Sequence, residues 1–286
     1  DLFHEKALNN KCRIIHSCGF DSIPSDLGVL LLQKDSQEKF NKVCNDVNLY
    51  VSSIKGGLSG GTISSMVNIK NYFRSHPEKR NVLKSPYSLN PIDKIKKNVR
   101  QSVLKSVRWD NTFNKWTSPF LMSGVNTRVV QRTNAIAEFS YGKNFKYKEM
   151  SSFDRGLNGF LKACAMLMIL AFLQFSLGSN LLLWILKKTI FPKPGEGPSK
   201  EKMQSGFFKL KIIGSINEIQ KNSVTVLGDS DPGYSATAKM LTESAISTLL
   251  NEDKMPKKYG VLTPASAIGL TLIERLKGKG ILFKID

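Results

Sequence analysis

The feature that most constrains the fold is an uncharged apolar run, ACAMLMILAFLQFSLGSNLLLWIL, which covers residues 163–186. At about 1.5 Å per residue, a helix of this length could cross the hydrocarbon core of a bilayer. Gln174, Ser176 and the Gly178–Asn180 triplet interrupt the run, so it could also form a helix-turn-helix that enters one leaflet. A buried helical pair in a soluble domain is the third alternative. We favour contact with a membrane or lipid, with a hydrophobic segment over 157–191.

The overall composition is that of a folded, strongly basic protein. The 286 residues have a net charge of +19, and 41% of them are hydrophobic. Basic residues are densest between Lys70 and Lys115, where twelve of them accompany three acidic ones. Such an excess suits nucleic acid, an anionic membrane surface or an anionic cofactor, and a general compositional bias explains it equally well. No RNA-binding aromatic pair, zinc-finger spacing or basic heptad region appears, so nucleic acid is not an expected partner.

The cysteines and histidines do not indicate a metal site. The four cysteines have no C-x-x-C spacing, and the three histidines have no H-x-x-x-H spacing. A disulfide framework and a zinc site are therefore not expected. Reduced thiols in an intracellular protein fit this pattern better.

Residue patterns along the chain predict an α/β fold. Helices are expected over 3–9, 25–33, 62–73, 91–107, 235–250 and from 263 to about 277. Strands are expected over 13–17, 47–54 and 281–285, as one or two strands over 129–141, and as a hairpin of 207–215 and 222–229. Thr263 before Pro264 is a strong helix start, with threonine as the N-cap and proline in the first turn.

Two turns are candidate ligand sites because each leads into a helix. In SCGFDSIPSDLG (17–28) a short strand turns into a helix, and ligands of α/β proteins often bind at such turns. One aspartate can cap the helix, and the other is free to orient a ligand; a cap alone and a cap with a ligand both stay open. In GDSDPGYSATA (228–238) a tight turn precedes a helix, where Tyr234 is a packed residue or, less favoured, a proton donor.

The glycine-rich turn GGLSGG matches a catalytic motif without the rest of its machinery. Gly57–Gly61 fits the G-x-S-x-G nucleophile elbow, with Ser59 as the nucleophile. His76 is the only downstream histidine, and no acidic residue lies between the two, so a catalytic triad is not expected. The turn lacks the lysine of a phosphate-binding P-loop, and no G-x-G-x-x-G opens a helix in this chain. Its glycines more simply allow a tight turn close to a ligand or a neighbouring element.

Six stretches together resemble one family, the saccharopine dehydrogenase-like oxidoreductases. In chain order they are HEKA, CGFDSIPSDLG, GGLSGGTISS, PGEGPSKEK, GDSDPGYSATAKMLTESA and GVLTPASAIGLTLIERL. The resemblance covers nearly the whole chain. The family includes bacterial trans-acting enoyl reductases of glycolipid synthesis and animal proteins of lipid droplets and membranes. More distantly, GFDSIPSD is similar to the GLDPGID turn of true saccharopine reductases.

The resemblance implies a division of the chain into three parts. Residues 1–46 would be the late part of a Rossmann-type doubly wound domain. Residues 47–228 would be an inserted α+β substrate and dimer domain that carries the hydrophobic segment, and 229–286 would return to the Rossmann-type domain. The glycine fingerprint that holds the pyrophosphate of NAD(P) is then expected upstream of Asp1, outside this chain.

The resemblance also implies candidate site residues, although no catalytic residue can be transferred to this chain. The nicotinamide end of NAD(P) is expected at Cys18, Gly19, Phe20 and Asp21. The substrate side is expected at Ser59, Gly60, Gly61, Thr62, Asp231, Gly233 and Tyr234. In a hydride transfer the protein acts mainly by positioning the cofactor against the substrate and by excluding water, so few reactive side chains are needed.

The function implied is an NAD(P)-dependent oxidoreductase that acts on a lipid-like substrate. Its expected place is intracellular, at a membrane or lipid droplet, and the family allows a homodimer. The alternative is a non-catalytic membrane or lipid-droplet protein that keeps the fold. Saccharopine is not the expected substrate, because binding a small, multiply charged molecule does not require an uncharged apolar run such as residues 163–186.

Overall fold

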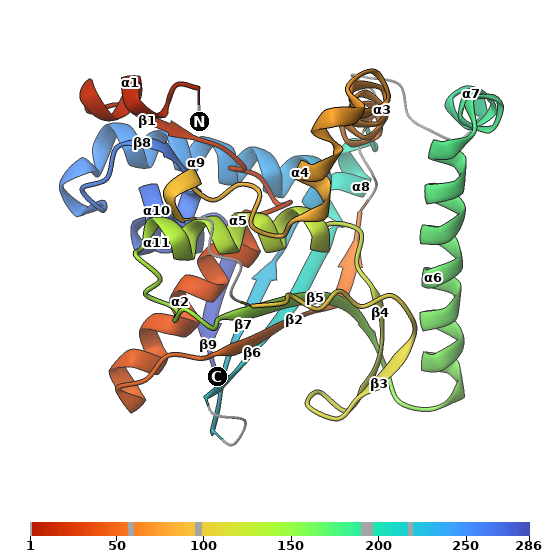
Figure 1. Cartoon of the computed structure of the whole chain (residues 1–286). Helices are drawn as coiled ribbons and strands as arrows, with labels where there is room; N and C mark the ends of the chain where they lie inside the picture. The colour runs from red at the N-terminus through yellow and green to blue at the C-terminus, as the bar shows by residue number, and fades with distance from the viewer. Residues whose placement is uncertain (1, 57–59, 95–98, 190–196, 217–219) are drawn as a thin grey trace.

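The structure, a computed structural model, shows a mixed α/β fold and describes residues 2–56, 60–94, 99–189, 197–216 and 220–286. Within these residues, seven strands form one mixed sheet in the order β3–β4–β5–β2–β6–β7–β9 (Figure 1). A separate two-stranded sheet pairs β1 with β8 in parallel. The predicted α/β class, with one hydrophobic helical segment, is confirmed.

The elements have the following bounds. The strands are β1 (Arg13–Ile15), β2 (Asp46–Lys55), β3 (Arg108–Asp110), β4 (Lys115–Pro119), β5 (Lys146–Phe153), β6 (Phe207–Ile216), β7 (Gln220–Gly228), β8 (Gly260–Leu262) and β9 (Ile281–Ile285). The helices are α1 (His4–Asn9), α2 (Ile23–Phe40), α3 (Gly60–Ser75), α4 (Asn81–Lys84), α5 (Ser123–Ile136), α6 (Leu157–Gly178), α7 (Asn180–Thr189), α8 (Lys200–Gln204), α9 (Thr237–Leu250), α10 (Pro264–Ala267) and α11 (Leu270–Lys277). Short turns of helix are η1 (Pro77–Arg80), η2 (Ile92–Lys94), η3 (Pro232–Ala236, π-type) and η4 (Glu252–Lys254).

The main core lies between one face of the large sheet and the helices that cover it. β2 is central, pairing in parallel with β5 and antiparallel with β6. Its alternate residues Val47, Leu49 and Val51 are buried on the covered face, as the period of a strand requires. α2 lies so close to this face that a Cβ on Gly28 would be 2.3 Å from the Cδ1 of Ile212.

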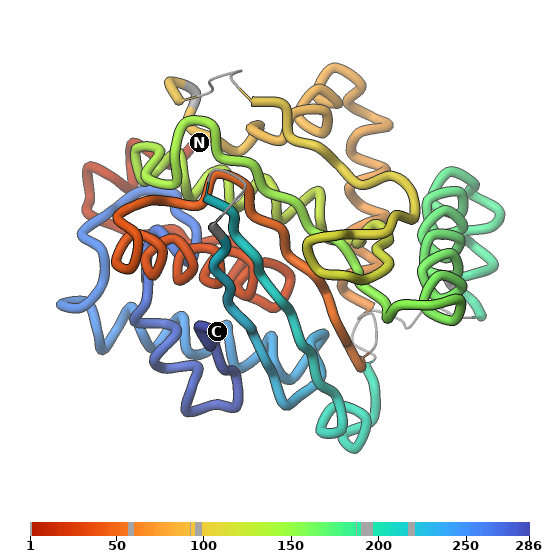
Figure 2. Tube along the Cα trace, turned by 90° about the horizontal axis from the view of Figure 1, so that it is seen from below, coloured from red at the N-terminus to blue at the C-terminus, as the bar shows by residue number. Residues whose placement is uncertain are grey.

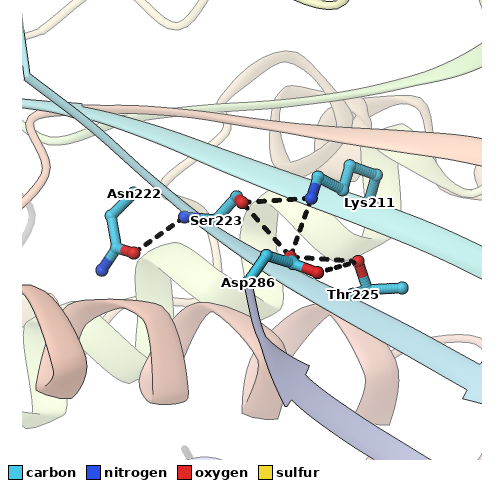
Figure 3. Close-up of polar contacts among 5 residues, drawn as sticks. All are labelled: Lys211, Asn222, Ser223, Thr225 and Asp286. Carbon is cyan, nitrogen blue, oxygen red and sulfur yellow. Dashed lines mark hydrogen bonds and ion pairs between the residues drawn. The ribbon is translucent and has the colours of Figure 1, made fainter.

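On the opposite face of the sheet, Figure 2 shows β6 and β7 crossing in front of α2. Here the carboxylate of Asp286, after β9, accepts hydrogen bonds from Lys211 Nζ at 2.7 Å and from Thr225 Oγ1 at 3.0 Å (Figure 3). Ser223 Oγ donates a further bond at 3.2 Å. These contacts connect the end of the chain with β6 and β7.

The Asp286 contacts predict a small, pH-dependent contribution to stability. Burial alone would raise the pKa of Asp286, but bonds from Lys211 and Thr225 and the charge of Lys211 outweigh it and lower the pKa. A lowered folded-state pKa gives stability that is present above the unfolded pKa and is lost as pH falls. We expect Asp286→Asn to reduce the free energy of unfolding by about 1 kcal/mol at neutral pH and by less in acid. Urea unfolding checks this, and equal losses at both pH values would contradict it.

Most of the predicted elements are present. The helices expected near the start, over 62–73 and over 235–250 are α1, α3 and α9, and the predicted hairpin is β6 and β7. Thr263 caps α10 as expected, because its hydroxyl accepts from the backbone of Ser266 in a capping box. The helix predicted from Thr263 onward is divided into α10 and α11 at Gly269, whose φ is +68°.

The strands predicted over 129–141 are wrong, because α5 occupies most of this range. The usual apolar helix pattern is hidden here, since much of the buried surface of α5 is polar. Asn126, Thr133 and Asn134 are almost completely buried and are satisfied by hydrogen bonds to core partners. A helix whose inward side is polar does not show the apolar 3.6-residue period from which helices are predicted.

The helix predicted over 91–107 is also wrong in the described residues. Only η2 is helical there, and residues 99–107 form no helix. Gln101 explains this, because its side chain accepts from the backbone N–H of Tyr147 at 2.9 Å and donates to the carbonyl of Phe145 at 3.0 Å. The segment therefore runs beside the start of β5, whose backbone bonds it helps to satisfy.

The hydrophobic segment forms two consecutive helices, α6 and α7, which meet at the extended residue Ser179. By length and composition alone, α6 is apolar enough to cross a membrane, and 11% of its apolar window is buried. Within the described residues α6 is therefore mostly exposed, and the choice between membrane contact and a buried pair stays a prediction. Figures 1 and 2 show both helices at one edge of the molecule, and α6 packs against β4.

The three-part division of the chain stays a prediction. β1, from residues 1–46, pairs with β8, from residues 229–286, with Arg13 opposite Gly260. β9, also from the last part, pairs with β7 and so extends the large sheet. The first and last parts thus meet in one small sheet, and the last part also completes the sheet of the middle part.

Candidate functional site

The first candidate segment, Cys18–Asp21, is a tight turn between β1 and α2. The backbone N–H of Ser22 and that of Ile23 both donate to the carbonyl of Gly19, at 3.2 and 3.0 Å. The N–H of Phe20 donates to Thr237 Oγ1 at 3.1 Å. The turn is therefore held both by its own backbone and by the first residue of α9.

The side chains of this turn differ in their environments. The ring of Phe20 packs on Phe208, with centroids 4.7 Å apart. Burial raises the pKa of the half-buried Cys18 thiol, and a hydrogen bond from Ser244 opposes the rise, so the group stays a thiol at neutral pH. Asp21 is an exposed residue. The surrounding protein nevertheless removes part of the water around its carboxyl, and this raises the pKa of Asp21.

The second candidate segment, Asp231–Tyr234, is a capped turn that begins η3. The buried carboxylate of Asp231 accepts from the backbone N–H of Tyr234 at 2.7 Å, and the N–H of Asp231 donates to Met203 O at 2.9 Å. Gly233 lies within η3. The ring of Tyr234 lies against Gly197, where an added Cβ would be 2.9 Å from its Cζ. The packed interpretation of Tyr234 is therefore favoured.

Thr237 and two glycines bring these segments together at one end of the sheet. The hydroxyl of Thr237 meets Phe20 N–H and also donates to the carbonyl of Pro232 at 2.8 Å. A Cβ on Gly56, just after β2, would be 2.3 Å from Asp231 Oδ1 and 2.7 Å from Pro232 Cδ. The turn after β1, the end of β2 and η3 are thus neighbours, as a shared site requires.

The glycine-rich motif is only partly described. Ser59 lies outside the described residues, and Gly60, Gly61 and Thr62 are the first three residues of α3. His76 follows the other end of α3, about 24 Å away along a 16-residue helix. It stacks on Tyr72 with centroids 4.5 Å apart. The histidine that a serine hydrolase would need is therefore far from this turn.

A buried polar cluster behind the first turn was not predicted as a unit. We use this name for eight residues: Ser22, Ser25, Asp26, Asn126, Thr133, Tyr147, Glu149 and Thr263. The carboxylate of Asp26 is fully buried, and it accepts from Thr133 Oγ1 and, at 2.8 Å, from the backbone N–H of Ala265. Thr133 shares a further hydrogen bond of 2.6 Å with Thr263. Burial raises the pKa of Asp26 to about 6, although these hydrogen bonds oppose the rise.

The second carboxyl of the cluster is Glu149 on β5. It accepts from Tyr147 Oη at 2.5 Å and from Asn126 Nδ2 at 3.0 Å, and Asn126 accepts in turn from Ser22 Oγ at 2.9 Å. Burial raises the pKa of Glu149, against hydrogen bonds from Ser25, Tyr147 and Asn126. The cluster attaches the first turn of α2 to α5, β5 and α10, and so fixes the Cys18–Asp21 turn in front of it.

The sequence contained signals for only some of these residues. Asp26 lies in the SIPSD motif and Thr237 in GDSDPGYSATA, so both were near predicted positions. Asn126, Thr133 and Glu149 lie in segments without a recognised motif, and their roles depend on the fold. In the described residues, no group of three or more His, Cys, Asp or Glu side chains could hold a metal ion.

Comparison with known proteins identifies the family, although no family model matches the chain. A Mycobacterium tuberculosis protein named "Putative trans-acting enoyl reductase" is 34% identical over 292 residues, covering 98% of this chain and 69% of that protein. A trans-acting enoyl reductase of Mycobacterium bovis is 31% identical over 291 residues, covering 99% and 69%. One from Mycobacterium ulcerans is 29% identical with the same coverage. The chain therefore belongs to the trans-acting enoyl reductases, a group of saccharopine dehydrogenase-like oxidoreductases.

Proposed function

We propose that the protein reduces a carbon–carbon double bond of a lipid-like substrate with NADPH or NADH, at a membrane surface. Family membership supports the reductase chemistry, since the relatives are named enoyl reductases. The observation that carries the proposal is the junction at Thr237, which joins the Cys18–Asp21 turn to η3. A bound nicotinamide supplies a hydride to one alkene carbon, and the other carbon takes a proton.

The Cys18–Asp21 turn fits the nicotinamide end of the cofactor better than its pyrophosphate. The N–H groups of Phe20, Ser22 and Ile23 are already used by protein acceptors, and Pro24 has none. A pyrophosphate bound at this turn would also lie near the buried carboxyl of Asp26 in the first turn of α2. Repulsion between the two acidic groups disfavours pyrophosphate binding there. The neutral dihydronicotinamide ring does not need a set of free backbone N–H groups. We therefore assign this turn to the nicotinamide end of the cofactor, and other residues hold the pyrophosphate.

The residues of this chain then act mainly by positioning and by excluding water. Thr237 fixes the Phe20 backbone, and the Phe20–Phe208 pair gives the turn an apolar side. The buried polar cluster holds the start of α2 behind it. Ordering the reacting groups in a dry site is the main protein contribution to a hydride transfer.

The lipid-like substrate and the membrane location are supported by α6 and α7. Large apolar side chains of α6, including Met168, Phe172 and Phe175, are more than half exposed. Contiguous exposed apolar surface of this kind is typical of a protein or membrane interaction site. A lipid substrate would be available at the same surface.

Thr237→Val tests the proposed cofactor position. Valine keeps the shape of threonine but removes the hydroxyl bonded to Phe20 and Pro232, and we expect about tenfold weaker NADPH binding, or about 1.4 kcal/mol. Calorimetry should use this chain and a form extended upstream of Asp1. Thr248→Val is the matched control, because Thr248 is a partly exposed threonine near the other end of α9 whose hydroxyl donates only to Ala245 O within the helix.

The outcomes separate the enzyme from its alternative. Weaker binding by Thr237→Val alone supports the proposed site. Equal effects of both variants would place the cofactor elsewhere. If neither the chain nor its extended form binds NADPH or NADH, the protein is better described as a non-catalytic membrane protein that keeps the reductase fold.

A further inference from the structure

An open groove of about 890 Å³ lies at the start of α6, far along the chain from the candidate site. Its apolar walls are Trp109, Trp116, Leu157 and Phe160, and its polar lining includes Asn114 and Arg155. The rings of Trp116 and Phe160 are 4.9 Å apart, and those of the two tryptophans are 5.5 Å apart. We call this feature the tryptophan groove.

We propose that the tryptophan groove binds the headgroup and upper chain of an anionic phospholipid in a membrane, with α6 lying along the membrane plane. This inference rests on the proposed membrane location and adds to it a headgroup site, a lipid charge and a helix orientation. Three independent features of the groove and its surroundings support it.

The first feature is charge. Arg155 lines the groove, is exposed, and has no ion-pair partner among the residues that the structure describes. Its neighbour Asp154 is paired with Lys115 at 2.8 Å, so this acid does not neutralise it. Lys162, one and a half turns into α6, is also exposed. A free arginine beside apolar rings suits a phosphate with an attached alkyl chain.

The second feature is the apolar surface that continues from the groove. Leu157 belongs to the groove and is 72% exposed, and Leu161, one turn further along α6, is 56% exposed. Met168, Phe172 and Phe175 continue at spacings of three to seven residues, which keeps them on one side of the helix. An alkyl chain anchored at Arg155 would therefore meet apolar side chains along its length.

The third feature is the position of the tryptophans. Two of the three tryptophans, Trp109 and Trp116, line the groove at the start of α6, and the third, Trp184, is on α7 beyond the other end of α6. Trp184 is 55% exposed, and Lys188 Nζ lies 4.2 Å from its ring centroid. Tryptophan and snorkelling lysine are both characteristic of the headgroup level of a membrane.

The packing of α6 decides its orientation. Ala163 is completely buried, and Phe160 contacts Trp116 of β4, so the first part of α6 is attached to the sheet. A helix that crosses a bilayer along its axis would carry this sheet edge into the hydrocarbon, where charged residues such as Arg108 and Lys115 are costly. Lying in the plane, α6 keeps its exposed side in lipid and the sheet in water.

Flotation with vesicles tests the headgroup site. The full chain is mixed with phosphatidylcholine vesicles and with vesicles that also contain phosphatidylglycerol. We expect tighter binding to the anionic vesicles, and Arg155→Gln should weaken that binding about fivefold without changing binding to pure phosphatidylcholine. Arg100→Gln is the matched control, because Arg100 is an exposed arginine outside the groove.

Each other outcome has a definite meaning. If the chain binds both vesicles equally, or if the two arginine variants behave alike, the groove is not a headgroup site although the membrane location stands. If it binds neither, this inference and the membrane part of the proposed function both fail. If Phe172→Ser instead dissolves a dimer seen by light scattering, the exposed side is covered by a second copy and the inference fails.

The orientation has its own readout. A nitroxide at Met168→Cys, with the exposed Cys12 and the partly exposed Cys18 and Cys164 changed to serine, reports the depth of the middle of α6 in the bound state. An in-plane helix places this label at the level of the headgroups and upper chains. A label at the bilayer centre would show a spanning helix and overturn the in-plane arrangement.

Discussion

Asp26→Asn is expected to be more stable than the wild type at neutral pH. The difference in free energy of unfolding, variant minus wild type, should be up to about 3 kcal/mol larger at neutral pH than in acid. The carboxyl is fully buried, and burial raises its pKa in the folded protein to about 6, from the ordinary value of 3.8. A raised folded-state pKa gives stability that is complete below the unfolded pKa and is lost as pH rises through about 6. Wild-type stability therefore falls over this window, whereas asparagine has no carboxyl to ionise.

Asparagine can also preserve the local hydrogen bonds. Its carbonyl can accept from Ala265 N–H, and its amide can donate to Thr133 Oγ1, whose own proton can turn to Thr263. Urea unfolding at about pH 3 and pH 7.5 measures the difference between the two proteins, because pH 3 lies below the unfolded pKa. A carbon NMR titration of Asp26 should show a midpoint near pH 6. A midpoint near 4, with a constant stability difference, would contradict the account of the buried polar cluster.

Gly206→Ala is expected to destabilise the protein by about 3 kcal/mol, because the junction of α8 with β6 leaves no room for a side chain. A Cβ there would lie 2.4 Å from both the backbone nitrogen and the Cα of Asp231. These are backbone atoms that cannot turn aside, and the Asp231 N–H is bonded to Met203 O at 2.9 Å. The substitution would push the Asp231 turn out of place and disturb η3.

Gly178→Ala is the matched control for this substitution. A Cβ on Gly178, at the end of α6, would meet nothing within 4 Å. Alanine is also the better helix former, so stability should be unchanged or slightly higher. Thermal or urea unfolding of both variants measures the difference. A loss below about 1 kcal/mol for Gly206→Ala would show that the close contact with the Asp231 turn does not exist.

The turns of the candidate site could be predicted from sequence because their residues have local, specific roles. Pro24, Pro264 and the glycines restrict the backbone in ways that a sequence shows directly, and the cap at Thr263 was correct for this reason. The apolar run over 163–186 could also be interpreted from sequence, since its length and lack of charge limit the secondary structure that it can form. Its helices begin and end within a few residues of the predicted segment.

The remainder depended on contacts that are distant in sequence. α5 was mistaken for strands because Asn126 and Thr133 are buried polar residues, whose partners Glu149 and Asp26 are 23 and 107 residues away. Propensity and periodicity describe neighbours along the chain, so they do not reveal that a polar helix side faces a polar core. The non-helical path of residues 99–107 similarly depends on the bonds of Gln101 to the backbone of β5.

Transfer of deuterium is the most direct test of the central claim, that the protein is a nicotinamide-dependent enoyl reductase. The chain, in a form extended upstream of Asp1 and bound to vesicles, is incubated with NADPH deuterated at the transferred position and a long-chain enoyl thioester. We expect a saturated product with one deuterium on the carbon that receives the hydride and a solvent proton on the other. Thr237→Val should slow the transfer, whereas Thr248→Val should not. A folded protein that binds NADPH but transfers no deuterium to any enoyl substrate would contradict the account.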